Sequence, residues 1–205
     1  MRVGLVGDTH VPEAAPDLPR EAYAALAECD RILHCGDLHS IQVVDRLERL
    51  APTMVARGNG DTYGPSGGRP GVDEDPRVVE SLVFEVDGFR VGLTHDLEHA
   101  EGRSDASAAD VLANRFGGRV DVAVCGHTHV PMVWGLADGT AVVNPGSPTM
   151  PYGYLDVIGT VGYLDVSPGR FEISVVDLAT HANQLALVGP AVHPCTYGPR
   201  PTGGR

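Results

Sequence analysis

The sequence predicts an α/β fold built on parallel strands, and two observations support this prediction. In the first 60 residues, short apolar runs of strand length alternate with segments of helical periodicity. Each apolar run also ends at a glycine or a polar cluster that carries Asp, His or Asn. Strand, helix and strand in this order is typical of βαβ units, which deliver functional side chains at the carboxyl ends of their strands.

The first half of the chain is expected to contain three parallel strands and two connecting helices. In chain order these are strand 2–7, helix 19–28, strand 31–35, helix 40–50 and strand 53–56. Residues 62–76 are rich in Gly, Pro and Asp and lack apolar periodicity. We expect a surface loop there, either a lid that borders the site or a plain insertion.

The second half is expected to consist mainly of hairpins, because Asp-Gly pairs separate alternating apolar runs. The expected elements are strands 78–86 and 89–93, helix 106–116, strand 120–125, strands 132–136 and 140–143, and strands 159–166 and 171–176. Residues 1–188 are expected to form one domain. Residues 189–205 carry much Pro and Gly with little apolar pattern, and we expect a disordered tail.

Composition and charge exclude several classes of protein. The chain has 205 residues with 42% apolar content, which suits a globular core, and no apolar run approaches the length of a membrane span. Fifteen basic against 27 acidic residues give a net charge of −12, so a nucleic-acid polymer or an anionic membrane is not an expected partner. The N-terminal residues lack the apolar core of a secretory signal, and we expect a cytoplasmic protein.

The ends of the predicted strands carry seven side chains that are typical metal ligands. They are Asp8, His10, Asp37, Asn59, His95, His127 and His129. Nitrogen and oxygen donors without a thiolate favour divalent transition metals over Ca²⁺ or Cu(I). Seven ligands are too many for one ion, and a carboxylate can bridge two, so Asp37 on the middle of three consecutive motifs is the natural bridge.

Two ions at bridging distance predict metal-assisted hydrolysis of a phosphoester by attack of a metal-bridging hydroxide. Plainer interpretations exist for single residues. Asp37 and Asn59 each lie beside glycine and, taken alone, suit a helix cap or a turn. His127 and His129 also suit a solvated strand end. The ordered set of motifs favours ligands.

Five motifs in order resemble the signature of the calcineurin-like metallophosphoesterase superfamily, over about residues 1–177. They are Gly7-Asp8-Thr9-His10, Gly36-Asp37, Gly58-Asn59, Thr94-His95 and Gly126-His127-Thr128-His129. The size of the chain and Asn144-Pro145-Gly146-Ser147 are similar to the compact single-domain phosphodiesterase branch. The resemblance implies a four-layer αββα sandwich of two mixed β-sheets flanked by helices.

The same resemblance implies two divalent metal ions, with Mn²⁺ as the first choice and Fe²⁺, Zn²⁺ or Ni²⁺ as alternatives. Asp8, His10, Asp37 and His129 would hold one ion, and Asp37, Asn59, His95 and His127 the other. Asp37, Asn59 and His127 are the expected catalytic residues. The expected function is hydrolysis of a small phosphodiester. The alternative is a catalytically weak metal-binding scaffold for protein–protein interaction, and a homo-oligomer stays open.

The chain departs from the family pattern at two positions. Gly60 stands where many family phosphatases have a histidine, whose role resembles that of a general acid for the leaving group. Because this chain lacks that histidine, a preference for diesters or activated esters is predicted. His39 or His99 is a candidate to replace it, because each lies near a ligand in sequence. Asp96 stands where the family has glycine, and its carboxylate would either orient His95 or distort the site.

Overall fold

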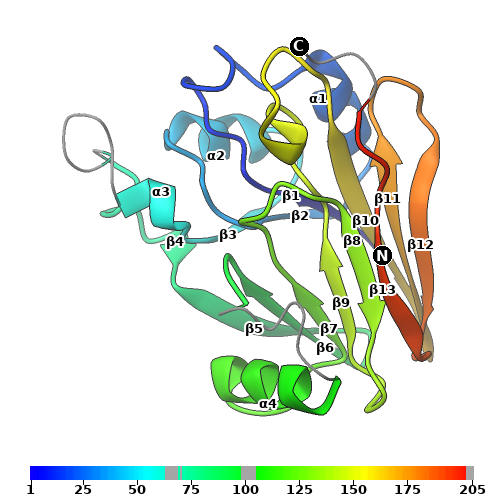
Figure 1. Ribbon diagram of the computed structural model, residues 1–205. Coiled ribbons are helices and arrows are strands. Elements are labelled where there is room, and N and C mark those ends of the chain that lie inside the picture. Colours follow the sequence, from blue (N-terminus) through cyan, green and yellow to red (C-terminus); the bar gives the residue numbers. More distant parts are fainter. Residues whose placement is uncertain (63–68, 70, 98–104, 202–205) are drawn as a thin grey trace.

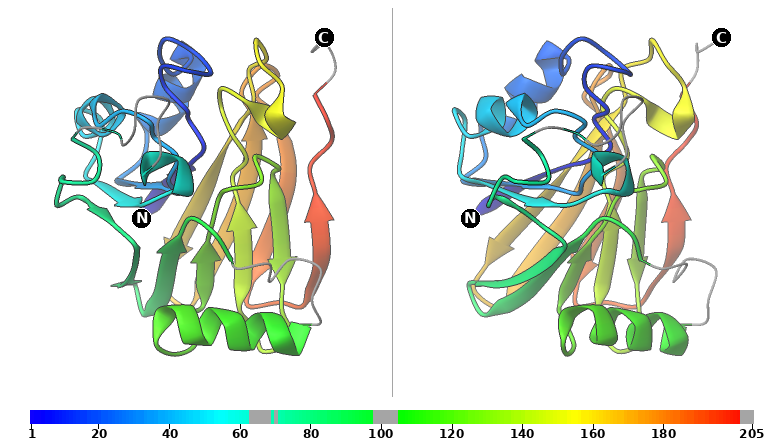
Figure 2. Two further views of the ribbon diagram at one scale, coloured as in Figure 1. Left: turned by 60° about the vertical axis from the view of Figure 1, so that its left-hand side comes forward. Right: turned by 90° about the vertical axis from the view of Figure 1, so that its left-hand side faces the viewer.

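The computed structural model describes residues 1–62, 69, 71–97 and 105–201. Its strands form two mixed sheets that pack face to face (Figure 1). Figure 2 shows α1 (Arg20–Leu26) and α2 (Gln42–Leu47) on the side of one sheet and α4 (Asp105–Phe116) against the other. The predicted four-layer αββα sandwich is therefore confirmed.

The first sheet has seven strands in the spatial order β12-β11-β10-β1-β2-β3-β4. They are β1 (Arg2–Val6), β2 (Arg31–His34), β3 (Thr53–Ala56), β4 (Val78–Val79), β10 (Thr160–Ser167), β11 (Arg170–Asp177) and β12 (Asn183–Gly189). Strands β1 to β4 pair in parallel, with α1 and α2 as the first two connections, as the βαβ pattern predicts. Strand β10 pairs antiparallel with β1 and begins an antiparallel half formed by β10, β11 and β12.

The second sheet has six strands in the order β13-β8-β9-β7-β6-β5. They are β5 (Ser81–Val86), β6 (Phe89–Thr94), β7 (Val122–Val124), β8 (Met132–Gly135), β9 (Ala141–Asn144) and β13 (His193–Tyr197). Both predicted Asp-Gly hairpins are present, as β5–β6 and β8–β9. Two short helices complete the described fold: α3 (Asn59–Thr62) and the 3-10 helix η1 (Pro151–Gly153).

Three apolar clusters hold the four layers together. Leu5 and Leu93 belong to the cluster between the two sheets. Leu26 of α1 packs on the outer face of the first sheet, and Leu112 and Phe116 of α4 pack on the outer face of the second. Because apolar side chains fill both faces of each sheet, the strand ends are the places where polar groups can gather.

The expectation of one strand over residues 78–86 is wrong. Val78 pairs with Val55 of the first sheet, whereas Ser81 pairs with Thr94 of the second. The chain thus changes sheets at Glu80. The apolar alternation runs through residues 78–86 without a break, so it does not indicate this change. Alternation indicates which side chains are buried, but not which strand is the hydrogen-bonded neighbour.

The expected disordered tail is also wrong for residues 193–197, which form β13. This strand pairs antiparallel with β8, and Tyr197 lies opposite Met132. Pro194 is compatible with this position because β13 is an edge strand. Residues 202–205, and residues 63–68 and 70 of the expected loop, lie outside the described residues. No helix of the described chain is long and apolar enough to span a bilayer.

Candidate metal centre

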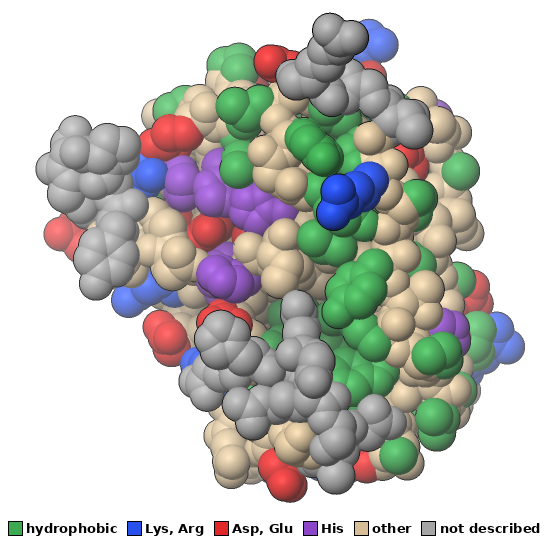
Figure 3. Space-filling view, in the orientation of Figure 1, with side chains coloured by type: hydrophobic (Ala, Val, Ile, Leu, Met, Phe, Trp, Pro, Cys, Tyr) green, Lys and Arg blue, Asp and Glu red, His purple; other side chains and the backbone are tan. Residues whose placement is uncertain are grey.

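The carboxyl ends of five strands from both sheets meet at one edge of the sandwich. β1, β2 and β3 of the first sheet and β6 and β7 of the second each lead into a segment that carries predicted ligands. Figure 3 shows histidine side chains gathered around acidic side chains on this face. The structure brings together all seven predicted ligands, in two groups that share Asp37.

The first group consists of Asp8, His10, Asp37 and His129. One ligand atom from each lies within 4.8 Å of those of the others. The Nε2 atoms of His10 and His129 are 3.1 Å apart. Asp8 is fully buried, and its Oδ2 has no hydrogen-bond partner among the described residues. A buried carboxylate oxygen without a partner is costly, so this position is suited to a cation.

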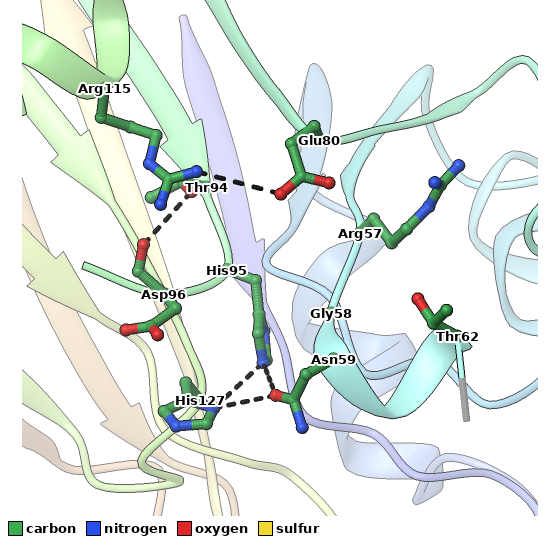
Figure 4. Close-up of a pocket in the computed structure, with 10 residues that line it drawn as sticks. All are labelled: Arg57, Gly58, Asn59, Thr62, Glu80, Thr94, His95, Asp96, Arg115 and His127. Atoms are coloured by element: carbon green, nitrogen blue, oxygen red, sulfur yellow. Dashed lines mark hydrogen bonds and ion pairs between the residues drawn. The ribbon is translucent and has the colours of Figure 1, made fainter. Parts of the chain in front are cut away.

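The second group consists of Asn59, His95 and His127. Asn59 Oδ1 lies 3.0 Å from both His95 Nε2 and His127 Nδ1, and these two nitrogens are 3.3 Å apart. Figure 4 shows the three side chains converging at one side of a pocket.

Asp37 lies between the two groups. Its Oδ2 is 3.5 Å from His10 Nε2 in the first group, and its Oδ1 is 3.6 Å from His95 Nε2 in the second. The side chain is 6% exposed. One carboxylate oxygen facing each group is the arrangement that a bridging ligand needs.

Backbone carbonyls fix the orientation of two of the imidazoles. His95 Nδ1 donates to the carbonyl of Cys35 at 2.7 Å, and His129 Nδ1 donates to the carbonyl of Met150 at 3.0 Å. In the neutral ring each Nε2 then carries a lone pair that points into the centre. In the second group the Nε2 lone pair of His95 then faces the amide oxygen of Asn59 at 3.0 Å, and a bound cation would relieve their repulsion.

Burial keeps the histidines of the first group neutral. It lowers the pKa of His10 to about 4 and lowers the pKa of His129. Burial, together with the nearby carboxylate of Asp37, raises the pKa of Asp8 well above its ordinary value. All three shifts reflect the cost of burying charge, and neutral imidazoles are the form that binds a metal.

Several ligands have a left-handed backbone. The φ angles of Asp8, His10, Asp37, His127 and His129 lie between 44° and 73°. Such angles are uncommon outside glycine and cost about 1 kcal/mol or more each unless neighbouring contacts impose them.

The contacts that hold these loops come from residues that sequence reasoning did not single out as site residues. Fully buried Asp61 accepts hydrogen bonds from the backbone N–H groups of Asp37, His39 and Gly58 at 3.0, 3.0 and 2.9 Å. It thereby joins the loops after β2 and β3. Its place two residues after Asn59 in Gly-Asn-Gly-Asp was the available sequence signal.

The end of β9 and the segment after it hold the ligand loops that follow β1 and β7. Asn144 Nδ2 donates to the Gly126 carbonyl at 2.7 Å and to Thr128 Oγ1 at 3.0 Å. Ser147 Oγ donates to the Asp8 carbonyl at 2.7 Å. The Asn-Pro-Gly-Ser motif therefore stabilises the backbone around the ligands of both sheets.

Three further residues were expected beside the ligands. His39 lies next to the first group, where its ring centroid is 4.2 Å from that of His10. Asp96 lines the pocket beside His95, whose Nδ1 is held by the carbonyl of Cys35. His99 lies outside the described residues.

A pocket of about 330 Å³ opens beside the second group (Figure 4). Its lining is polar and carries charges of both signs. The lining residues are Arg57, Gly58, Asn59, Thr62, Glu80, Thr94, His95, Asp96, Arg115 and His127. Arg115 and Glu80 form an ion pair at 3.9 Å on the side away from Asn59.

The chain is similar to several known phosphoesterases. A family model described as the calcineurin-like phosphoesterase superfamily domain matches residues 1–168. A probable metallophosphoesterase of Methanothermobacter thermautotrophicus is 38% identical over 151 residues, which cover 74% of this chain and 79% of that protein. A phosphodiesterase of Methanocaldococcus jannaschii is 26% identical over 187 residues, 86% of this chain and 100% of that protein.

Solved structures show the same fold. Wild-type Vps29 of Entamoeba histolytica, complexed with Zn²⁺, superimposes with a TM-score of 0.68 at 22% identity, over 93% of this chain and 100% of that chain.

Proposed function

The chain belongs to the calcineurin-like phosphoesterase superfamily, and from this premise we propose that it is a dinuclear metal-dependent phosphodiesterase that hydrolyses a small substrate. The convergence of seven nitrogen and oxygen ligands into two groups around Asp37 is the observation that carries this proposal.

In this proposal the first group holds one divalent cation and the second group holds another, with Asp37 common to both. Two such ions would supply Lewis acidity, which would activate water and neutralise charge on the phosphoryl oxygens. Mn²⁺ is the proposed ion, with Fe²⁺, Zn²⁺ or Ni²⁺ as alternatives, because the ligand set has no thiolate.

The chain's own residues orient the substrate and hold the ligands. Asn59 and His127 line the pocket, so their side chains lie where a phosphoryl group would enter. Asp37 accepts the Gly60 N–H at 2.7 Å through Oδ1, which fixes the carboxylate between the two groups. The carbonyls and side chains behind the ligands preserve this arrangement when substrate binds.

The pocket supports a small polar substrate. A volume of about 330 Å³ lies at the lower end of the range for ligand sites. Its two arginines are accompanied by Glu80 and Asp96, so the lining lacks the basic stripe that a polynucleotide requires. The net charge of −12 acts against a polyanion in the same way.

Hydrolysis of a matched aryl phosphodiester and aryl phosphomonoester with Mn²⁺ tests the proposal. We expect the wild-type protein to hydrolyse the diester faster than the monoester. Asp37→Asn removes one charge from the shared ligand and should lose nearly all of the diester hydrolysis. Asp87→Asn is the matched control, because Asp87 occupies an exposed hairpin turn with a left-handed backbone. Wild-type protein that binds two ions and hydrolyses neither ester would contradict the proposal.

The alternative of a scaffold is supported by one surface feature away from the centre. Tyr154, Leu155 and Ile158 are 37%, 51% and 39% exposed on one loop, and Ile158 also lines a cavity of about 260 Å³. Inactive, metal-loaded protein would favour this second candidate, since clustered exposed apolar side chains are typical of interaction surfaces.

A further inference from the structure

The imidazole of His39 is buried beside the centre, held firmly through one nitrogen and left free at the other. Its side chain is 9% exposed. Nδ1 lies 2.7 Å from Glu13 Oε2 and 2.9 Å from Arg69 Nη2, and Arg69 also forms an ion pair with Glu13. The Nε2 atom is buried and has no hydrogen-bond partner among the described residues.

Glu13 and Arg69 act as a clamp on this ring. The Arg69 side chain is 11% exposed, and its Nε also donates to the Gly60 carbonyl at 3.2 Å. The clamp thus joins the segment after His10 to α3 at Gly60. A rigid ring with an unpaired buried nitrogen costs free energy, so a partner for Nε2 is expected in the working state of the protein.

Gly60 shows which way Nε2 points. A Cβ atom added at residue 60 would lie 2.5 Å from His39 Nε2 and 2.9 Å from Asp37 Oδ1. The free nitrogen and the shared carboxylate therefore border the same small space. Glycine keeps that space open, because a side chain at residue 60 would collide with the ring.

From these contacts we propose that His39 is a substrate-contact residue, whose Nε2 hydrogen-bonds an oxygen of the phosphoryl group bound at the metal centre. Glu13 and Arg69 are its positioning residues. The inference rests on the proposed function, because it places a phosphoryl group beside Asp37. In the neutral ring Nε2 carries the N–H when Nδ1 accepts a hydrogen bond from Arg69 Nη2. An imidazole N–H is a suitable donor to an anionic oxygen.

Binding of inorganic phosphate to the Mn²⁺-loaded protein tests the inference without relying on catalysis. We expect His39→Asn to weaken phosphate binding by about tenfold to a hundredfold, the value of a hydrogen bond to a charged group. Asn suits the left-handed φ of 64° and is too short to reach the same space. His181→Asn is the matched control, since His181 is exposed and has a φ of 59°.

A double-mutant cycle makes the test sharper. Glu13→Gln should weaken phosphate binding alone, by loosening the hold on the ring, and by less than His39→Asn does. It should have little further effect in the His39→Asn background. The number of bound ions, measured by plasma mass spectrometry, should stay unchanged in every variant.

Two results would overturn the inference. One is phosphate affinity in His39→Asn equal to that of the wild type; the other is loss of a bound ion in that variant, which would make His39 a metal ligand. Neither result affects the proposed function, which fails instead if wild-type protein with two bound ions hydrolyses neither ester. That failure would also remove the basis of the inference.

Discussion

The two ligand groups differ in their exposure to solvent. In the first group Asp8 is fully buried, and the side chains of His10 and His129 are 15% and 12% exposed. In the second group His95 is also buried, but Asn59 and His127 are exposed, and all three line the pocket. The first group is thus built as part of the interior, and the second as the wall of a cavity.

This difference indicates a division of labour between the two groups. A buried ligand atom that has no hydrogen-bond partner is stabilised most by a bound ion, and water has the least access to it. Exposed ligands can be hydrated when an ion leaves, so the free-energy cost of losing the ion is smaller. They are also accessible to a substrate. We therefore expect a tightly held ion in the first group and a more exchangeable one in the second.

The largest expected effect follows from changing the buried carboxylate. Asp8→Asn removes the charge that the first group holds in its interior, and we expect loss of the first ion and a fall in kcat on the order of a thousandfold. Steady-state kinetics and metal analysis measure both. The control is Asp156→Asn, because Asp8 and Asp156 have similar φ angles of 52° and 60°. If the variant kept both ions and its kcat stayed within about tenfold of the wild-type value, the proposed role of the buried first group would be contradicted.

A smaller effect is expected at a residue that supports both groups without facing an ion. Asp61→Asn weakens the hydrogen bonds to the backbone of Asp37 and Gly58, so affinity for both ions should fall by about tenfold to a hundredfold. Isothermal titration of metal-free protein measures this, with Asp45→Asn as a surface control. An effect confined to one ion would show that Asp61 supports only one group.

Metal removal compares the two groups directly. As the concentration of a chelator is raised, we expect the ion of the second group to leave first. The concentration needed should be about tenfold lower than that needed to remove the ion of the first group. His127→Asn should abolish the weaker step and leave the stronger step in place. Release of both ions in a single step would contradict this. It would show that coupling through the shared Asp37 outweighs the difference in ion affinity that we attribute to exposure.

The smallest effect is expected at the exposed loop. Leu155→Ser should change the free energy of unfolding by no more than about 0.5 kcal/mol and kcat by less than about twofold, because Leu155 is 51% exposed. Urea denaturation and the diester assay check this. A loss of hydrolysis in this variant would connect the loop to the centre.

The sequence allowed the ligand set to be predicted because each ligand follows a strand of recognisable pattern. Asp37 and Asn59 follow glycines at the ends of consecutive parallel strands, and such ends meet at one edge. The four layers came from family resemblance rather than from periodicity. The sheet change at Glu80 and the pairing of β13 were not predictable, because both depend on which distant strand lies alongside.

The supporting residues were missed for a related reason. Asp61 and Ser147 bond to backbone groups of loops that are distant in sequence, so their local surroundings resemble ordinary turns. His39 was selected only for its nearness to Asp37. The structure adds its contacts with Glu13 and Arg69 and its approach to Gly60, which no local pattern records.

The strand order of the first sheet also has a consequence for the order of folding. β1 is hydrogen-bonded between β2, which follows it closely, and β10, where Leu5 lies opposite Gly162. The amino-terminal parallel strands can assemble from local units, but one side of β1 stays unpaired until residues 160–167 have been synthesised. Closing so long a loop is entropically slow, so completion of this sheet is expected to be a late step in folding.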